Sequence, residues 1–412
     1  MPAVGPYDSI PCGLRDTEMG RNNLSGFDFT EAQLELREGV RRLCEDFDAD
    51  YWRQVDETGD FPEAFVSAMA SGGWLGAAMP EALGGAGLGL TEAALVMQAV
   101  AESGAGFSGA SAVHLNIFGP MPIVKFGSEA QKASTIPRLI DGRDRMCFAV
   151  TEPDSGLDTA SLTTRAERRG NGWVINGRKV WTTMAQRANK ILIIARTTPR
   201  DEVKRPTEGL SLFYTDFDRS RITATVIPKM GRKAIESNSV FIDNLEVPGE
   251  DLVGEEGKGF AYLLSGLNPE RVLIGAEAVG LGRAALKRAA DYARERIVFG
   301  RPIGQNQGIA HPLARAWMGL EAASLMAFRA AALFDAGKPC GAEANAAKYL
   351  GGEAGFAACE AAVLTHGGMG YAKEYHVERY FREAMIARIA PVSREMICNF
   401  IAEQVLDLPK SY

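Results

Sequence analysis

The spacing of apolar residues changes twice along this chain of 412 residues. From Phe29 to about residue 145, apolar positions such as Leu34 and Val40 recur at the three- to four-residue spacing of amphipathic helices. Near Met146 the period shortens to that of strands, and helical spacing returns after about residue 250. The order predicts an α+β protein with a helical N-terminal domain at 29–145, an antiparallel β domain at 146–250 and a helical C-terminal domain at 251–412.

Local signals support the expected helices. Thr30 and Gln33 match a capping box, and further helices are expected to open at Pro62, Thr91 and Ser128. Long helices are expected later in the chain, at 271–294, 308–335, 341–364 and 393–406. Residues 1–28 contain three prolines, four glycines and no periodicity, so we expect a loosely ordered N-terminal arm.

The glycine-rich stretch PEALGGAGLGL at 80–90 separates two of the early helices. Its GAGLGL portion lacks the G-x-G-x-x-G spacing of a dinucleotide-binding turn, and no β-branched strand precedes it. We therefore interpret it as a tight loop. The chain also lacks a Walker phosphate loop and a G-x-S-x-G elbow, which disfavours nucleoside triphosphate and hydrolase chemistry.

The middle segments are short and rich in β-branched and aromatic residues. They read MCFAVTEP, GWVINGRKVWTT, ANKILIIARTT, LSLFYTDF, ITATVIP and SVFIDNLEVP. Asn176-Gly177 is a strong hairpin-turn signal, and Trp181 and Thr183, two residues apart after that turn, should project from one face of a strand. A Trp plane can cover a flat cofactor while the Thr hydroxyl bonds to a ring heteroatom. The alternative is a core Trp beside an edge Thr.

The composition is typical of a protein that acts on small molecules. The apolar share is 46%, the charged share is 24%, and the formal charge of -7 disfavours nucleic acid or an anionic membrane as a partner. The six cysteines form no CxxC pair and the four histidines lack metal-ligand spacing, so we expect neither a disulfide framework nor a metal site. No apolar run reaches the ~18 residues of a membrane span and the start does not resemble a signal peptide, so cytoplasmic location is the default expectation.

The stretch LNPERVLIGAEAVG at 267–280 contains a carboxylate, Glu270, whose role is open. Asn268 is a plausible N-cap and Pro269 suits the first helical position, so Glu270 would lie in a first turn, where the helix dipole favours an acid. Alternatively, a carboxylate that enters an apolar cavity has a raised pKa and can take a proton from a weakly acidic carbon.

A second stretch, FAVTEPDSGLDT at 148–159, would place backbone N–H groups and a hydroxyl at a strand end, which suits a polar ring edge or a phosphate. Together with NGRKVWTT, ERIVFGRPIGQNQ and HGGMGYAKEYHVERYFRE, in this order, it resembles the acyl-CoA dehydrogenase family across about residues 30–405. The stretches PEALGGAGLG and GEEGKGF add to the match. The resemblance implies a helical N-terminal domain, a middle β domain and a C-terminal four-helix domain.

The resemblance also implies FAD as the cofactor and assigns residues to it. The positions that match flavin contacts are Phe148, Val150, Thr151, Gly156, Trp181 and Thr183, with Trp181 covering the ring and Thr183 bonded to it. Arg296, Phe299 and Gln307 match residues that reach the FAD of a neighbouring subunit, and Gly367 and Gly368 match glycines near its pyrophosphate. Ser393 stands at a cofactor-binding Thr position. Shared sites imply an obligate homodimer or homotetramer.

Three positions depart from the family pattern. Leu157 replaces a frequent Ser and Leu364 a Gln, which puts single hydrogen bonds to FAD in doubt. Many members keep their catalytic Glu in a Tyr-Glu-Gly-Thr segment, but IAPVSRE at 389–395 has Pro391 at the Glu position. Isovaleryl and long-chain members place the base on the helix that here begins LNPER, where Glu270 stands. We therefore expect Glu270 to be catalytic, with Glu395 as the second choice.

The predicted function is FAD-dependent α,β-dehydrogenation of an acyl-CoA, with Glu270 as the α-proton base, hydride transfer to flavin N5 and Arg271 ordering the substrate site. The resemblance implies that a ribityl hydroxyl and a backbone N–H near Pro391 polarise the thioester carbonyl; because proline has no N–H, Val392 is the expected donor. An electron-transfer flavoprotein is the expected acceptor. A flavin oxidase or monooxygenase, or a non-enzymatic relative that has kept the fold, are the alternatives.

Overall fold

The computed structural model describes residues 29–410, so the expected arm at 1–28 lies outside the described residues. The first part is helical, as predicted. Its helices are α1 (Glu31–Glu45), α2 (Ala49–Thr58), α3 (Glu63–Ser71), α4 (Leu90–Val100), α5 (Gly106–Phe118), α6 (Met121–Phe126) and α7 (Glu129–Ile140). The predicted capping box at α1 is confirmed, because Thr30 and Gln33 bond reciprocally. Ser128 caps α7 in the same way, and Pro62 is the N-cap of α3.

The glycine-rich stretch between α3 and α4 is a tight loop, as predicted. Gly84 and Gly87 have φ values of +87° and +64°, which side chains rarely adopt. A Cβ on Gly85 would lie 2.1 Å from the carbonyl oxygen of Met79, so the loop closes on its own backbone.

The start of α4 depends on a residue far away in the sequence. The helix begins at Leu90, one residue before the predicted Thr91. The N–H groups of Leu90 and Thr91 donate to the carboxylate of Asp335 at 2.7 and 2.9 Å. Asp335 is the last residue of α9 (Gln307–Asp335), so a negative charge from the C-terminal part satisfies this helix N-terminus.

The middle part is one sheet with the order β6-β7-β3-β2-β4-β5-β8, and β1 pairs with β4. The strands are β1 (Met146–Ala149), β2 (Arg165–Arg169), β3 (Gly172–Thr183), β4 (Lys190–Arg196), β5 (Leu210–Asp216), β6 (Ile222–Val226), β7 (Ser237–Val247) and β8 (Leu252–Val253). Most pairs are antiparallel, as expected, but β1 and β2 run parallel to β4. The β domain is therefore confirmed with two parallel pairs added.

The predicted hairpin turn at Asn176-Gly177 is wrong. Strand β3 continues through these residues, and its register with β7 shifts between Ile175 and Gly177, which is a β-bulge. A Cβ on Gly177 would lie 2.4 Å from Oγ1 of Thr164, so a close neighbour explains the glycine. The reversal occurs earlier, where β2 and β3 pair on either side of Gly170, whose φ is +61°.

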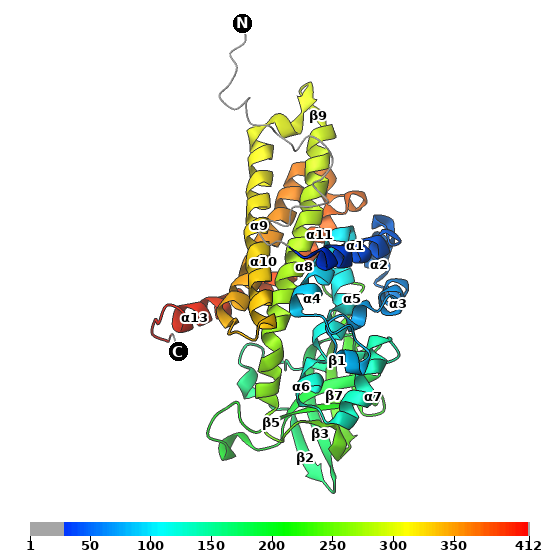
Figure 1. Cartoon of the computed structure of the whole chain (residues 1–412), viewed down its shortest axis with the longest axis vertical. Coiled ribbons are helices and arrows are strands. Elements are labelled where there is room, and N and C mark those ends of the chain that lie inside the picture. The colour runs from blue at the N-terminus through cyan, green and yellow to red at the C-terminus, as the bar shows by residue number, and fades with distance from the viewer. Residues whose placement is uncertain (1–28, 411–412) are drawn as a thin grey trace.

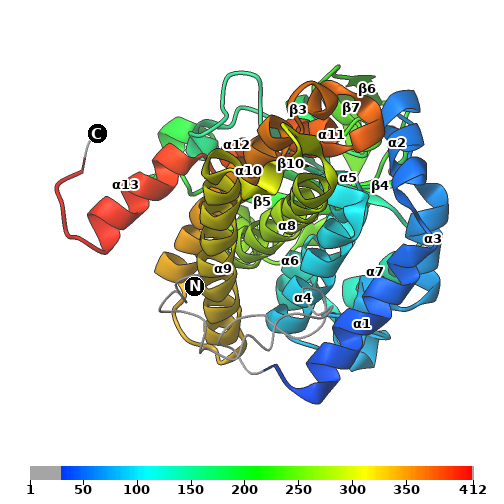
Figure 2. The ribbon, with the colours of Figure 1, turned by 90° about the horizontal axis from the view of Figure 1, so that it is seen from above.

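The C-terminal part is helical, as predicted, with a small hairpin inside it. Its elements are α8 (Gly259–Glu295), β9 (Ile297–Val298), β10 (Arg301–Pro302), α9, α10 (Gly341–His366), α11 (Val377–Ala384), α12 (Ile386–Ile389) and α13 (Arg394–Gln404). The long helices α8, α9 and α10 run side by side, with the sheet at one end and β9 at the other (Figure 1). Helix α13 extends outward from the body (Figures 1 and 2).

The predicted start of the LNPER helix is also wrong. Helix α8 begins at Gly259, and Pro269 lies inside it. An internal proline costs about 3 kcal/mol, but the first turns bury Leu263 and stack Tyr262 on Phe126 with ring centroids 4.1 Å apart. Tertiary packing thus extends α8 to residues before its local start signal. Glu270 therefore lies in the middle of the helix and not in its first turn.

Helix α5 occupies the centre of the molecule. Every residue from Gly106 to Phe118 is buried, including Ser108, Ser111 and His114. Viewed from above, α4 and α5 lie between α1 and α8 (Figure 2). Polar side chains on α5 must therefore find their partners inside the protein.

Within the described residues, no helix is long and apolar enough to cross a membrane. In the same range, no group of three or more His, Cys, Asp or Glu side chains could hold a metal ion. Cys44, Cys147, Cys340, Cys359 and Cys398 are free thiols. Cys12 lies outside the described residues.

Candidate active site

Glu270 lines a small apolar pocket. The other lining residues come from α5, α6, β1, α8 and the turn between α5 and α6: Phe118, Gly119, Pro122, Phe148, Leu263, Gly266 and Leu267. Phe148, predicted to contact the flavin, thus shares this pocket with the predicted base. No hydrogen bond or ion pair of the Glu270 carboxylate is found among the residues that the structure describes. Of the groups that line the pocket, Glu270 alone can exchange a proton.

The surroundings of Glu270 suit a base that works near neutral pH. Burial raises the pKa of Glu270 to about 7, against the lowering effect of the nearby cations His114, Arg271 and Lys348. Glu277 adds to the rise. A carboxyl with such a pKa is partly ionised at pH 7 and binds a proton more strongly than an exposed glutamate.

Arg271 is adjacent to Glu270 but bonds elsewhere. Its Nη1 donates to Oδ1 of Asn268, one turn earlier on α8, at 2.8 Å. Burial lowers the pKa of Arg271, although Glu270 opposes this effect. Its Nε is buried without a partner in the structure. The guanidinium thus retains a free donor beside the predicted base, which suits the predicted role in substrate binding.

The segment that follows α12 holds no acid at the expected family position. Lys348, buried on α10, donates to the carbonyl oxygen of Val392 and so anchors this turn. Ser393 is the N-cap of α13, and its hydroxyl accepts from the N–H of Met396 at 3.3 Å. Glu395 lies exposed on α13 and accepts from Nε of Arg394 at 2.6 Å. That hydrogen bond lowers the pKa of Glu395, which makes it a poor base.

Lys179 and Glu152 were not identified from the sequence, yet they hold the predicted flavin-binding turn. Lys179 is fully buried, and its Nζ donates to Glu152 Oε1 at 3.0 Å and to the Val150 carbonyl at 2.9 Å. Glu152 also accepts from the N–H groups of Thr163 and Thr164 at 2.7 and 2.9 Å. The sequence gives only a weak indication of this pair: a charged residue, Glu152, shortly after β1, and another, Lys179, within β3.

Trp181 stands out on the surface next to this turn. The residue is 56% exposed although its side chain is large and apolar. Its φ of +61° is unusual for a bulky residue and coincides with a second bulge, between Lys179 and Thr182. Thr182 is buried, whereas Thr183 is partly exposed. The N–H of Val180 donates to the Thr151 carbonyl at 2.8 Å, which joins this part of β3 to the turn.

The residues expected to serve a neighbouring FAD lie apart from this group. Arg296, Phe299 and Gln307 are exposed at the hairpin end of the long helices, away from the sheet (Figure 1). Phe299 is 100% exposed. A single chain therefore does not bring these three side chains to the turn after β1.

The glycines assigned to the cofactor face open space. A Cβ added at Gly156, Gly367 or Gly368 would meet no atom within 4 Å. Leu364 precedes the last two on α10 and is 71% exposed. The open surface at these glycines can admit a ligand close to the backbone.

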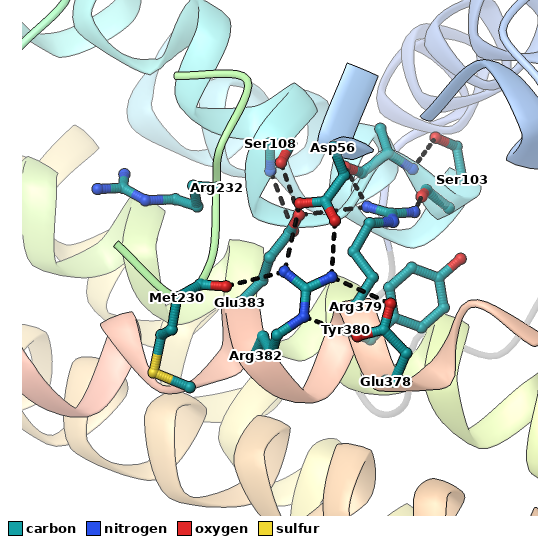
Figure 3. A network of polar contacts seen from close by, with 12 residues as sticks. Asp56, Ser103, Ser108, Met230, Arg232, Glu378, Arg379, Tyr380, Arg382 and Glu383 are labelled. Atoms are coloured by element: carbon teal, nitrogen blue, oxygen red, sulfur yellow. Dashed lines mark hydrogen bonds and ion pairs between the residues drawn. The ribbon is translucent and has the colours of Figure 1, made fainter. Parts of the chain in front are cut away.

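The ERYFRE motif forms a buried polar network that links distant parts of the chain (Figure 3). Arg379 donates to the Gly104 carbonyl at 2.6 Å, and Glu383 accepts from the Ser108 hydroxyl at 2.6 Å. Arg382 bonds to Asp56 on α2, at 2.6 Å, and to the Met230 carbonyl. This network fixes the N-terminal end of α5, the helix whose other end lines the pocket.

Another buried pair, also not identified from the sequence, lies near Glu270. His114 on α5 and Glu277 on α8 have Nδ1 and Oε1 only 2.5 Å apart. They are 163 residues apart in the sequence, so no local pattern could reveal the contact.

The chain is similar to known proteins along most of its length. Residues 30–143, 147–245 and 257–406 match the N-terminal, middle and C-terminal domains of acyl-CoA dehydrogenases. Acyl-CoA dehydrogenase FadE12 of Mycobacterium tuberculosis is 38% identical over 93% of this chain and 98% of its own length. The caffeyl-CoA reductase-Etf complex subunit CarC of Acetobacterium woodii is 32% identical over 85% and 93%. The structure of butyryl-CoA dehydrogenase from Megasphaera elsdenii superposes with a TM-score of 0.88 at 27% identity, over 93% and 100%.

Proposed function

Because this chain belongs to the acyl-CoA dehydrogenase family, we propose that Glu270 is the base that removes the α-proton of its substrate. The protein is an oxidoreductase, and its reaction is the FAD-dependent dehydrogenation of an acyl-CoA thioester. With Glu270 as the proposed base, we infer that the chain belongs with the family members that carry their catalytic Glu on the LNPER helix.

The observation that carries this proposal is the environment of Glu270. Its carboxylate lines an apolar pocket without a bonding partner among the described residues, and burial raises its pKa to about 7. Pro391 has no acid-base group, and Glu395 is exposed and paired with Arg394. The α-proton of a thioester is weakly acidic, so its removal requires a base with a raised proton affinity at a fixed position.

The bonds and charges balance with one proton and one hydride. The Glu270 carboxylate takes the α-proton, and the electron pair of that C–H bond forms the Cα–Cβ double bond. When bound, FAD supplies the two-electron acceptor that takes the β-hydride at N5. The carboxyl group must return its proton to solvent before the next turnover.

Several observations support FAD binding. Lys179 and Glu152 fix the turn after β1, which would hold the flavin through Phe148, Val150 and Thr151. Nearby, the exposed ring of Trp181 can cover a flat cofactor, and the partly exposed Thr183 can bond to its edge. Gly156 and Ser393 complete the residues proposed for this side.

The remaining FAD contacts are proposed to come from a second copy of the chain. Arg296, Phe299, Gln307, Gly367 and Gly368 lie on exposed parts of the C-terminal helices and the hairpin, and no described residue lies within 4 Å of a Cβ added at either glycine. A large aromatic ring that is fully exposed, such as Phe299, gains stability when a partner covers it. We infer a homodimer or homotetramer in which the cofactor site is shared.

Polarisation of the thioester carbonyl is assigned to the turn at 390–393. Pro391 cannot donate a hydrogen bond, so the N–H of Val392 is the proposed donor. Lys348 supports this role because it binds the carbonyl oxygen of Val392 from inside the bundle and restricts the orientation of that residue. A donor held in place before the reaction stabilises the developing enolate charge more effectively than a mobile one.

The proposed electron acceptor is an electron-transfer flavoprotein. The support is the relative CarC, which is a subunit of a complex that contains one. Anaerobic reduction with an acyl-CoA, followed by mixing either with an electron-transfer flavoprotein or with air, tests this assignment. Rapid reoxidation by the flavoprotein and slow reoxidation by air are expected; reoxidation by air at the turnover rate would identify an oxidase.

The base assignment is tested by anaerobic mixing of the FAD-loaded protein with a panel of acyl-CoAs. The wild type should lose its flavin absorbance with its substrate, whereas Glu270→Gln should bind the same acyl-CoA without fast bleaching. Bleaching of both proteins at the same rate would remove Glu270 from the mechanism.

A further inference from the structure

His114 and Glu277 form a buried ion pair that the reaction as described does not use. Nδ1 of His114 lies 2.5 Å from Oε1 of Glu277, and their side chains are 10% and 0% exposed. A carboxylate oxygen only accepts, so Nδ1 carries the hydrogen in this contact. In a buried ion pair each charge depends on the other. If one partner is removed, the remaining charge is buried without compensation, which is strongly destabilising.

Neither residue has all its hydrogen bonds satisfied. Nε2 of His114 and Oε2 of Glu277 are both buried without a partner. A buried polar atom without a partner is destabilising, and an unpaired position of this kind in a native protein needs an explanation. Stabilisation of the fold therefore does not explain why this pair is present.

The pair lies directly behind the pocket. Phe118, which lines the pocket with Glu270, is one turn after His114 on α5, and the two rings are 4.6 Å apart. On α8, Glu277 follows Glu270 by seven residues, about two turns, so both carboxylates are on one face of the helix. His114 on the facing helix α5 therefore interacts with both carboxylates.

The charged groups around the two carboxylates come from several elements. The pKa of Glu270 is influenced by the charges of His114 on α5, of Arg271 and Glu277 on α8, and of Lys348 on α10. The pKa of His114 is influenced by the charges of Glu277, Glu270 and Arg232. Arg232 lies on the loop between β6 and β7, and its guanidinium donates to the hydroxyl of Ser111, one turn before His114, at 2.8 Å.

We propose that His114, held as an imidazolium by Glu277, is a positioning residue whose charge keeps the Glu270 carboxylate ionised at the pH at which the enzyme works. The proposal rests on the proposed function, because it assumes that Glu270 is the base. It assigns to the buried pair a role that packing cannot supply, namely a fixed positive charge behind the base.

The direction of the effect follows from the charges. Burial alone would lower the pKa of His114, but the carboxylates of Glu277 and Glu270 raise it above its usual value. The resulting cation favours the ionised form of Glu270 and opposes the rise that burial causes. Without it, Glu270 would be mostly protonated at neutral pH and unable to accept the α-proton.

The first test is the pH dependence of flavin reduction in His114→Gln and Glu277→Gln. Glutamine is similar in size to both side chains and neutral. Loss of a neighbouring opposite charge shifts a pKa by about one unit or more, so the acid limb of the reduction rate should move up by at least about one pH unit in His114→Gln. Glu277→Gln removes the group that retains the proton on His114, but it also removes a carboxylate that itself raises the pKa of Glu270, so its limb should move less than that of His114→Gln.

Comparison of the rates at high and low pH separates this role from a structural one. Near pH 7 the His114→Gln rate should fall about fivefold, whereas well above the shifted limb it should equal the wild-type rate. A purely structural role would lower the rate by the same factor at every pH and leave the limb in place. His311→Gln, a change at an exposed histidine of α9, is the matched control and should leave the profile unchanged.

A second measurement uses the wild type and does not depend on the folding of a variant. The chain has four histidines, so a ¹⁵N-histidine NMR spectrum is simple, and the signal missing in His114→Gln identifies this residue. At pH 7 both ring nitrogens of His114 should carry hydrogen. A neutral imidazole at that pH, or an unmoved acid limb in His114→Gln, would overturn the proposal.

Failure of this proposal can be distinguished from failure of the proposed function. If Glu270→Gln abolishes flavin reduction while the limb in His114→Gln stays in place, the base stands and the pair has no tuning role. If Glu270→Gln is reduced at the wild-type rate, the base assignment itself is wrong, whatever the NMR spectrum shows.

Discussion

Lys179 donates to Glu152 across 3.0 Å inside the middle sheet, with the two side chains 0% and 4% exposed. The same ammonium group binds the carbonyl oxygen of Val150 at 2.9 Å. The contact connects β3, which carries Trp181, to the turn that carries Thr151. Two parts of the proposed flavin site are thus fixed relative to one another by one buried charge pair.

Replacement of this lysine should damage stability and cofactor binding together. Lys179→Met leaves the Glu152 carboxylate buried without its cation, so the free energy of unfolding should fall by about 3–5 kcal/mol. FAD retention should weaken as well, because Val150 loses its anchor. Urea unfolding of the protein and the flavin content after gel filtration measure the two effects.

The control for this change is Lys190→Met in strand β4 of the same sheet. Lys190 pairs with Asp216, whose side chain is 80% exposed, and such a pair contributes less than about 1 kcal/mol. Equal losses of stability in the two variants would contradict the account of the buried pair.

Acid should destabilise the protein through Glu152. Burial tends to raise the pKa of Glu152, but Lys179 and the bonds from Thr163 and Thr164 outweigh it and lower the pKa to about 2. Because the unfolded chain binds this proton more readily than the folded one, stability is full above the unfolded pKa and is lost as pH falls from about 4.5 towards 2. In Glu152→Gln this part of the pH dependence should be absent. Unfolding free energies of both proteins between pH 6 and 3 measure the difference; parallel curves would exclude Glu152 as the cause.

The proposed sharing of the cofactor site between two copies of the chain predicts that a change far from the flavin turn reduces FAD binding. Arg296→Ala should lower FAD retention at least several-fold without loss of helix content, because the side chain is proposed to reach the partner's cofactor. Arg294→Ala is the matched control two residues earlier, where the arginine pairs with Asp291 of its own helix. Sedimentation gives the oligomeric state of the two variants, and their flavin content gives the FAD that each retains. A fully flavin-loaded monomer would show that the site is complete in one chain.

The sequence was most informative where short-range contacts determine the structure. The capping box at Thr30 needs only Gln33, three residues on, and both bonds are present. Similarly, the sequence itself shows that Pro391 stands where many family members have their catalytic Glu, and this substitution indicates Glu270 as the base. The helical and strand periods place the three parts in order because each repeat reports the burial of its own element.

Predictions failed where a distant partner decides. Asn176-Gly177 has the composition of a hairpin turn, but β7 pairs along β3 through these residues and converts the signal into a bulge. Asn268 and Pro269 form a local start signal, yet burial of Tyr262 extends α8 back to Gly259. Local rules do not include these long-range contacts.

The buried charges illustrate the same limit for the site. Glu152 and Lys179 are 27 residues apart, and His114 and Glu277 are 163 apart. Each residue alone resembles an ordinary polar position in a strand or helix. Only the fold reveals that each of these buried residues lies beside an opposite charge, and an electrostatic interaction is stronger in such surroundings than in solvent.

The central claim is that Glu270 is the base. Glu270→Gln keeps the size and much of the hydrogen bonding of the side chain, so FAD and acyl-CoA should still bind. Loss of a general base typically slows the reaction by a factor of about 10² to 10⁴. Glu395→Gln is the control, because that exposed carboxylate already accepts from Arg394 and should be dispensable.

The measurement is stopped-flow reduction of the flavin in a single anaerobic turnover with saturating acyl-CoA. The account predicts that Glu270→Gln is reduced at least about 10²-fold more slowly than the wild type, while Glu395→Gln is reduced at nearly the wild-type rate. Reduction of Glu270→Gln at the wild-type rate, together with slow reduction of Glu395→Gln, would contradict it and move the base to α13.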